Sequence, residues 1–188
     1  MNSQTQKTVV EGAAGAIEVA IDGPSGGLQS KGMAEIAHPH PLFGGTRDNK
    51  AAPTLARAFT QCGWTAVRFN FRGVGGTAGT HDEGRGELDD LLAVASAVAP
   101  EGPVCLAGFS FGAFVTTHAF ERMSASRTIE KLVLVGTSVS RSVAAQIDTA
   151  AHPKTLVVHG EQDDTVALSA VMDWARPQAL PVTVIPGG

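Results

Sequence analysis

Residues 104–115 have the sequence VCLAGFSFGAFV, in which a short apolar run leads directly into the pattern G-x-S-x-G. The run 104–107 is typical of a buried strand, and the residues after Gly112 have the periodicity of a helix. In this context the pattern predicts a sharp turn that lifts the hydroxyl of Ser110 above a sheet. Glycines at both ends of the pattern let the strand and helix backbones approach each other. Ser110 is therefore the candidate nucleophile, and the N–H of Phe111 is a candidate oxyanion donor.

Around this segment the chain alternates between strand and helix patterns. Seven further strands are expected at 8–10, 16–21, 33–37, 65–71, 131–135, 155–158 and 182–185, and helices at 50–60, 86–99, 112–123 and 167–175. Most of the later strands are continuous apolar runs, which is typical of a parallel sheet covered on both faces. The first two are joined by a turn too short for a helix, so we expect an antiparallel hairpin. The whole predicts a doubly wound, mostly parallel α/β domain, with ligands beyond the carboxyl ends of its strands.

Length and composition limit the function classes. A chain of 188 residues indicates one domain. The net charge is −4 and no run of basic residues occurs, which argues against a nucleic-acid partner. No stretch is apolar enough for a membrane span or a signal peptide. Cys62 and Cys105 are expected to be buried free thiols in a reducing compartment. We expect a soluble cytoplasmic protein that has no membrane partner.

A hydroxyl nucleophile needs a base, and the base needs a carboxylate that orients it. The strand at 155–158 is followed by HGEQDDTV, which places an acid three residues beyond Gly160. Asp163 would then lie at the same sheet edge as Ser110 and is the candidate triad acid. Asp164 is the second candidate. Both aspartates could instead cap the helix that begins near Val166, a role that suits Asp164 better.

Three segments carry a resemblance to a known family: 38–46 with 48–50, 70–79, and the Ser110 turn with Asp163. The chain resembles the α/β-hydrolase superfamily, in particular small lidless bacterial serine hydrolases similar to dienelactone hydrolases and acyl-peptidase-like esterases. The resemblance implies an acyl hydrolase for a small-molecule ester or a related acyl substrate, without cofactor or metal. Dienelactone hydrolases have cysteine as the nucleophile, so Ser110 argues against a dienelactone substrate.

The resemblance also assigns the second oxyanion donor to the loop after the strand at 33–37. Pro39 and Pro41 have no N–H, so the donor is placed at Leu42, with Phe43 as the alternative. Many relatives insert a helical lid between the strands at 131–135 and 155–158. The intervening segment here is too short for one, which predicts an open site.

In the family the catalytic histidine follows the last strand. Here all six histidines precede Asp163, at positions 38, 40, 81, 118, 152 and 159. We therefore expect the histidine just beyond residue 188, together with a closing helix, and His81 is the alternative base. His38 and His40 could instead form part of a metal site, although a rigid loop better explains the prolines beside them.

Two other functions compete with a serine hydrolase. One is a catalytically inactive binding protein of the same fold. The other is a nucleotide-binding domain that uses the glycines at 73–79, which is disfavoured because no helix opens there and no Gly-Lys-Ser/Thr is present. Arg72 is expected to be a surface charge, and Asn49 and Lys50 are expected at the start of a helix. The sequence assigns neither the acyl length nor the oligomeric state.

Overall fold

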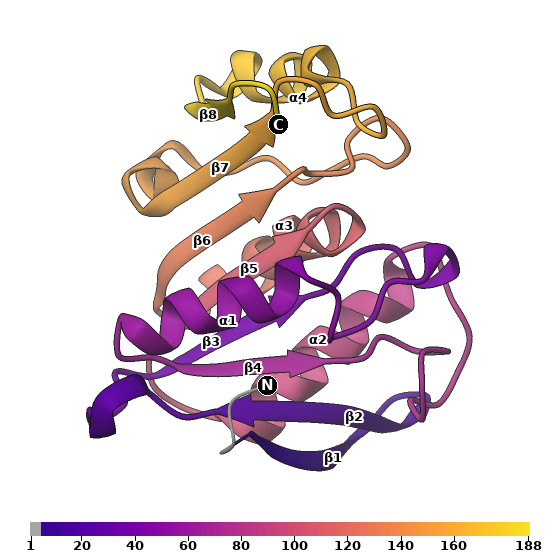
Figure 1. Cartoon of the computed structure of the whole chain (residues 1–188), viewed down its shortest axis with the longest axis vertical. Coiled ribbons are helices and arrows are strands. Elements are labelled where there is room, and N and C mark those ends of the chain that lie inside the picture. The colour runs from indigo at the N-terminus through magenta and orange to yellow at the C-terminus, as the bar shows by residue number, and fades with distance from the viewer. Residues whose placement is uncertain (1–4) are drawn as a thin grey trace.

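A computed structural model describes residues 5–188 and shows one eight-stranded sheet in the order β1-β2-β4-β3-β5-β6-β7-β8 (Figure 1). The strands are β1 (Gln6–Gly12), β2 (Gly15–Asp22), β3 (Met33–Ala37), β4 (Thr65–Phe69), β5 (Val104–Phe109), β6 (Ile129–Val135), β7 (Thr155–Gly160) and β8 (Val182–Ile185). The helices are α1 (Ala51–Gln61), α2 (Arg85–Val98), α3 (Phe111–Ser124) and α4 (Leu168–Ala175). Single 3₁₀ turns lie at η1 (Ser25–Gly27), η2 (Pro41–Phe43), η3 (Thr149–Lys154) and η4 (Arg176–Gln178).

The strand directions confirm the predicted doubly wound sheet with an N-terminal hairpin. β1 pairs with β2 and β2 with β4 in antiparallel fashion, whereas every pairing from β4 through β3 to β8 is parallel. The register sets Gly108 opposite Ala37 and Phe109 opposite Val135. The carboxyl ends of β3, β5 and β6 therefore meet at one edge of the sheet.

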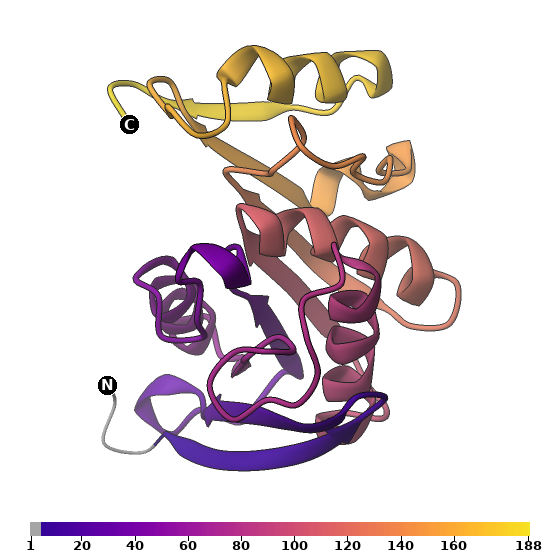
Figure 2. The same ribbon diagram turned by 90° about the vertical axis from the view of Figure 1, so that its right-hand side faces the viewer.

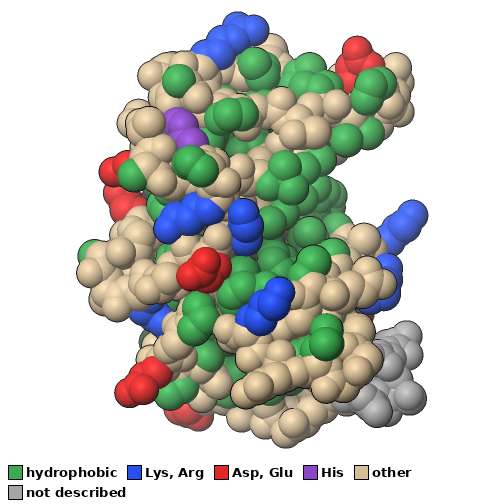
Figure 3. All heavy atoms as spheres, turned by 90° about the vertical axis from the view of Figure 1, so that its left-hand side faces the viewer, with side chains coloured by type: hydrophobic (Ala, Val, Ile, Leu, Met, Phe, Trp, Pro, Cys, Tyr) green, Lys and Arg blue, Asp and Glu red, His purple; other side chains and the backbone are tan. Residues whose placement is uncertain are grey.

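Helices cover the two faces unequally. α1 packs on one face of β3, β4 and β5, while α2 and α3 cover the opposite face (Figure 2). α4 packs beside β7 on the α3 side through Val171 and Ala175. On the α1 side, Leu156 of β7 is 46% exposed, and Figure 3 shows hydrophobic side chains in a hollow at this side of the molecule. Within residues 5–188 no helix is both long and apolar enough to cross a membrane.

Most expected element boundaries lie within two residues of the observed ones. β4 ends at Phe69, two residues early, because Asn70 turns its side chain into a network described below. Cys62 is exposed and not buried, since it follows the last turn of α1 and precedes Gly63, whose φ is 87°. Cys105 is buried in β5 as expected, and burial raises the pKa of its thiol to about 12.

The centre of the sheet contains a buried carboxyl group. Glu35 of β3 is 1% exposed, and neither of its carboxylate oxygens has a hydrogen-bond partner within the described chain. Burial raises the pKa of Glu35 well above its ordinary value, and the charge of Arg127 opposes that rise only in part. A buried carboxyl without partners destabilises the fold whenever it ionises.

Replacing this carboxyl with an apolar side chain of similar size should stabilise the protein. The pKa of Glu35 is raised in the folded protein. The protonated carboxyl therefore contributes fully to the free energy of unfolding below the unfolded pKa, and this contribution is lost as pH rises through the folded pKa. We expect Glu35→Met to raise the free energy of unfolding by about 1–3 kcal/mol at about pH 8, and by less at about pH 5. Urea unfolding at both pH values measures the difference.

Glu130→Gln in β6 is the matched control, since Glu130 is exposed and should change stability little at either pH. An equal effect of Glu35→Met at both pH values would show that the Glu35 carboxyl does not change its ionisation on folding.

Candidate active site

Ser110 occupies the sharp turn between β5 and α3, in a backbone conformation that residues with side chains rarely adopt. Its φ is 56° and its ψ is −117°. A strained conformation of this kind costs about 1–3 kcal/mol and persists only where the surroundings impose it. Here the Ser110 N–H donates to the carbonyl of Val135 at 2.8 Å. The Ser110 carbonyl accepts from the N–H groups of Phe114 at 3.1 Å and Ser138 at 3.3 Å.

The two glycines of the turn are required by close packing. A Cβ at position 108 would overlap the backbone at Gly112 and Ala113. A Cβ at position 112 would overlap the carbonyl oxygens of Ala37 and His38. The first turn of α3 therefore lies directly on the carboxyl end of β3. This contact aims the free N–H groups and the positive dipole end of α3, beginning with Phe111, at the space beside Ser110.

Asp163 follows β7 and lies at the edge where Ser110 is found. Its Oδ1 accepts the N–H groups of Thr165 and Val166, each at 2.9 Å. Its Oδ2 lies 3.6 Å from the position that a Cβ at Gly136 would occupy, and Gly136 follows the residue whose carbonyl binds Ser110. One carboxylate oxygen thus fixes the loop, and the other faces the strand end beside Ser110.

The two adjacent aspartates differ in a way the sequence did not predict. Asp164 is exposed, and its Oδ1 accepts only from the Thr165 hydroxyl at 3.4 Å. Neither aspartate caps α4, which begins at Leu168 without a side-chain cap, and it is Asp163 that binds the N–H groups of the turn before the helix. The reason is geometric, because the turn after Gly160 points the Asp163 side chain, and not that of Asp164, back over the following N–H groups.

Leu42 lies in η2, in the loop after β3, and its side chain is 70% exposed. Its N–H donates to Nδ1 of His40 at 3.2 Å, and the N–H of Phe43 donates to the His40 carbonyl at 3.1 Å. The His40 ring lies 4.8 Å from the Phe111 ring, centroid to centroid. The loop that carries Leu42 therefore borders the Ser110 turn, with His40 between them.

The other histidines are occupied by other groups. Nδ1 of His81 lies 2.8 Å from Oε1 of Glu87, whose carboxylate is fully buried. Three histidines contact backbone carbonyl oxygens through Nε2: His118 at Val143, His152 at Ile147, and His159 at Val166. In the described part of the chain, the assigned hydrogen bonds join no histidine to Asp163 or to the Ser110 hydroxyl.

The suggested metal pair is separated by the fold. Nε2 of His38 accepts the N–H of Phe71 at 3.0 Å, and its Nδ1 lies 2.6 Å from the carbonyl of Pro39. Burial lowers the pKa of His38 to about 4. Residues 5–188 contain no group of three or more His, Cys, Asp or Glu side chains arranged for a metal ion. His38 thus joins the ends of β3 and β4.

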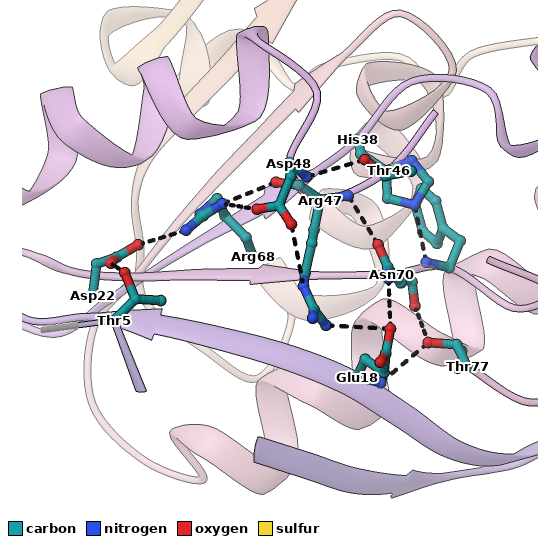
Figure 4. A network of polar contacts seen from close by, with 11 residues as sticks. Thr5, Glu18, Asp22, His38, Thr46, Arg47, Asp48, Arg68, Asn70 and Thr77 are labelled. Carbon is teal, nitrogen blue, oxygen red and sulfur yellow. Dashed lines mark hydrogen bonds and ion pairs between the residues drawn. The ribbon is translucent and has the colours of Figure 1, made fainter. Parts of the chain in front are cut away.

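A polar network beneath the site ties its loops to the sheet (Figure 4). Asn70 accepts the Arg47 N–H at 2.9 Å through Oδ1 and donates to Glu18 at 2.7 Å through Nδ2. Its carbonyl accepts the Thr77 hydroxyl at 3.0 Å. The loop after β3, the glycine-rich loop after β4 and the N-terminal hairpin are thereby fixed to one another.

Arg68 of β4 extends the network towards Asp22 at the end of β2 (Figure 4). Its guanidinium donates to Asp22 at 3.0 Å and to Asp48 at 2.8 Å, and to the carbonyl of Arg47 at 3.1 Å. Asp48, in the loop after β3, is therefore bound to the sheet.

The prediction for Arg72 was wrong, because it is not a free surface charge. Its guanidinium donates twice to Asp90 of α2, at 2.8 Å and 3.1 Å, and its backbone N–H donates to the same carboxylate at 2.9 Å. Asp90 and Glu87 are buried on the face of α2 that also carries Leu91 and Val94. Their helical spacing to these apolar residues was the available signal that both carboxylates lie on the buried face.

Comparisons with known proteins bear on the fold and the family of the chain. No protein-family model matches the chain. An uncharacterised curated protein of Rickettsia prowazekii is 32% identical over 118 residues, or 56% of this chain, and the chain spans 50% of that relative's length.

Two solved structures cover far more. The crystal structure of an α/β serine hydrolase without a lid from Xanthomonas campestris is 33% identical, with a TM-score of 0.86 over 99% of this chain and 84% of that chain. An α/β serine hydrolase homologue from Coxiella burnetii is also 33% identical, with a TM-score of 0.80 over 97% and 88% of the two chains. The segment between β6 and β7, where a lid would be inserted, contains only the turn η3. The chain belongs to the α/β serine hydrolases without a lid.

Proposed function

We propose that this protein is a carboxylesterase-like acyl hydrolase in which Ser110 attacks the carbonyl carbon of a small-molecule ester. The observation that carries the proposal is the strained turn at Ser110, held by backbone bonds on both sides and by two glycines that admit no side chain. Strain of this kind is found where a fold presents a reactive group. The position at the carboxyl edge of a doubly wound sheet is where such folds bind ligands.

The reaction then follows the triad pattern. The Ser110 hydroxyl forms a bond to the acyl carbon and passes its proton to a histidine, which later protonates the leaving alcohol. Water attacks the acyl-enzyme, again losing its proton to the histidine, and releases the acid and free Ser110. Asp163 orients the histidine through the carboxylate oxygen that does not cap the loop.

In the family the triad histidine follows the last strand, which corresponds to β8 here. The Gly188 carbonyl accepts the N–H of Gln162, the neighbour of Asp163, at 2.6 Å. The chain after β8 therefore lies next to the loop that carries Asp163. Nδ1 of His81, the alternative base, lies 2.8 Å from Glu87, and its ring lies 5.4 Å from that of Phe111.

Two backbone N–H groups would stabilise the oxyanion, those of Phe111 and Leu42. The Phe111 N–H lies at the amino end of α3, where the helix dipole favours negative charge. The Leu42 N–H is bound by the neutral acceptor His40 in the free protein. A charged oxygen accepts a stronger hydrogen bond than a neutral acceptor does. The Leu42 N–H would therefore exchange Nδ1 of His40 for the oxyanion mainly in the transition state.

Labelling with a fluorophosphonate tests the nucleophile directly. In the full-length natural protein we expect stoichiometric labelling at Ser110 and hydrolysis of p-nitrophenyl acetate, both abolished by Ser110→Ala. Ser140→Ala is the matched control, because Ser140 is exposed in the loop after β6. Mass spectrometry of the labelled peptide identifies the site.

An unlabelled Ser110 in a correctly folded full-length protein, together with absent turnover, would instead support an inactive binding protein of the same fold.

The triad acid is tested by comparing the two aspartates. Asp163→Asn keeps an oxygen that can accept from Thr165 and Val166, so the loop should stay folded, but it removes the charge that orients the histidine. We expect kcat to fall by about 10⁴-fold, as for the equivalent change in serine proteases. Asp164→Asn should change kcat by less than about threefold, because its carboxylate is exposed.

Steady-state kinetics with p-nitrophenyl acetate, and thermal unfolding of each variant, provide the comparison. A large loss in Asp164→Asn with little loss in Asp163→Asn would exchange their assigned roles.

A further inference from the structure

One side chain contacts both of the residues to which the oxyanion donors are assigned. Nδ1 of His40 accepts the Leu42 N–H at 3.2 Å, and the His40 ring packs on Phe111 at 4.8 Å. Leu42 and Phe111 belong to different segments, η2 after β3 and the first turn of α3. The relative position of their N–H groups therefore depends on whatever connects these segments, and His40 does so directly.

The side chains of the turn that carries Leu42 contribute few anchors. The side chains of Leu42 and Phe43 are 70% and 74% exposed, so neither is held in a core. Phe43 packs only at the surface, where its ring lies 4.7 Å from His40 and 5.8 Å from the guanidinium of Arg141. His40, by contrast, is enclosed by the rings of Phe43, His81 and Phe111, with centroids 4.7–4.8 Å away. The turn is therefore held by the half-buried His40, through its ring contacts and through its carbonyl, which accepts the N–H groups of Phe43 and Gly45.

We infer that His40 is a positioning residue that holds the Leu42 N–H beside the Phe111 N–H until the oxyanion takes it. The inference rests on the proposed hydrolase function and extends it to a side chain outside the triad. His40 itself exchanges no proton with the substrate. It acts through Leu42, because a donor displaced by even one ångström contributes little to transition-state stabilisation.

This role requires a neutral imidazole, since a protonated Nδ1 cannot accept the Leu42 N–H. Three charged or titratable groups face the His40 ring: His81 from the glycine-rich loop, Glu87 from α2, and Arg141 from the loop after β6. Burial lowers the pKa of His40, and His81 and Arg141 lower it further against the opposing charge of Glu87. The acceptor is thus retained at neutral pH and lost in acid.

Two variants separate the acceptor from the ring. His40→Phe keeps an aromatic ring against Phe111 but removes the acceptor, and we expect kcat to fall by about 10- to 100-fold with little change in KM. His40→Asn restores an acceptor on the same side-chain carbon that bears Nδ1, and kcat should recover at least about tenfold relative to His40→Phe. His152→Asn is the control, because His152 lies in η3 at the opposite edge of the sheet and contacts only the Ile147 carbonyl.

The pH dependence of kcat gives a second readout that simple packing would not move. With p-nitrophenyl acetate, the acid limb of the wild-type profile should reflect two protons, one on the catalytic histidine and one on His40. Where His40 titrates, the wild-type acid limb should therefore be steeper than the slope of about 1 that one proton gives, and His40→Asn should show a slope of about 1 throughout. This comparison decides the matter even if His40→Phe does not fold.

The outcomes separate the two proposals. A wild-type protein that neither hydrolyses the ester nor reacts with the fluorophosphonate overturns the proposed function, and the role of His40 with it. If the wild-type protein is active and His40→Phe keeps full kcat, only the role of His40 is overturned. The same holds if a folded His40→Asn shows the wild-type acid limb.

Discussion

The contact of α3 with the end of β3 is the constraint on which the site depends. Because Gly112 has no side chain, the first turn of the helix rests on the carbonyl oxygens of Ala37 and His38. This approach forces the chain to turn sharply at Ser110, and it brings the amino end of α3 to the loop that follows β3. A methyl group at position 112 would separate these two segments. The proposed nucleophile and both proposed oxyanion donors would then no longer be held in fixed positions relative to one another.

The loops around this contact are fixed mainly by buried polar bonds. Asn70 connects the loops after β3 and β4, and Asp90 binds Arg72 at the start of the glycine-rich loop. Such bonds are directional, so they specify one arrangement of loops that have few apolar residues to bury. The core shows the opposite case, since the carboxyl of Glu35 has no assigned hydrogen-bond partner. Buried polar groups with partners therefore fix the loops around the site, whereas the buried carboxyl without assigned partners destabilises the centre of the sheet.

The fold and the Ser110 turn were predictable because their signals are local. Apolar runs located the strands, and the glycine spacing around Ser110, read together with its flanking strand and helix, predicted the turn. Asp163 was placed at the correct edge, but its capping bonds depend on a turn that spacing alone does not define. The pairs His81–Glu87 and Arg72–Asp90 join side chains from the glycine-rich loop to α2. Their partners depend on how the loop folds back over the helix, which no periodicity encodes. Cys62 was wrongly predicted to be buried, because the sequence around it does not show that α1 ends at Gln61.

A site without a lid cannot use closure over the substrate to increase the reaction rate. Enzymes that close over the substrate exclude water, and this strengthens every electrostatic interaction inside. The segment between β6 and β7 offers no such cover here, so the proposed oxyanion donors would act close to solvent. Their effect then depends on being fixed before the charge develops, because a preorganised donor needs no rearrangement in the transition state. The Phe111 N–H is fixed by helix packing on β3. The Leu42 N–H lies on an exposed turn, so in the proposed mechanism its position depends on the half-buried side chain of His40.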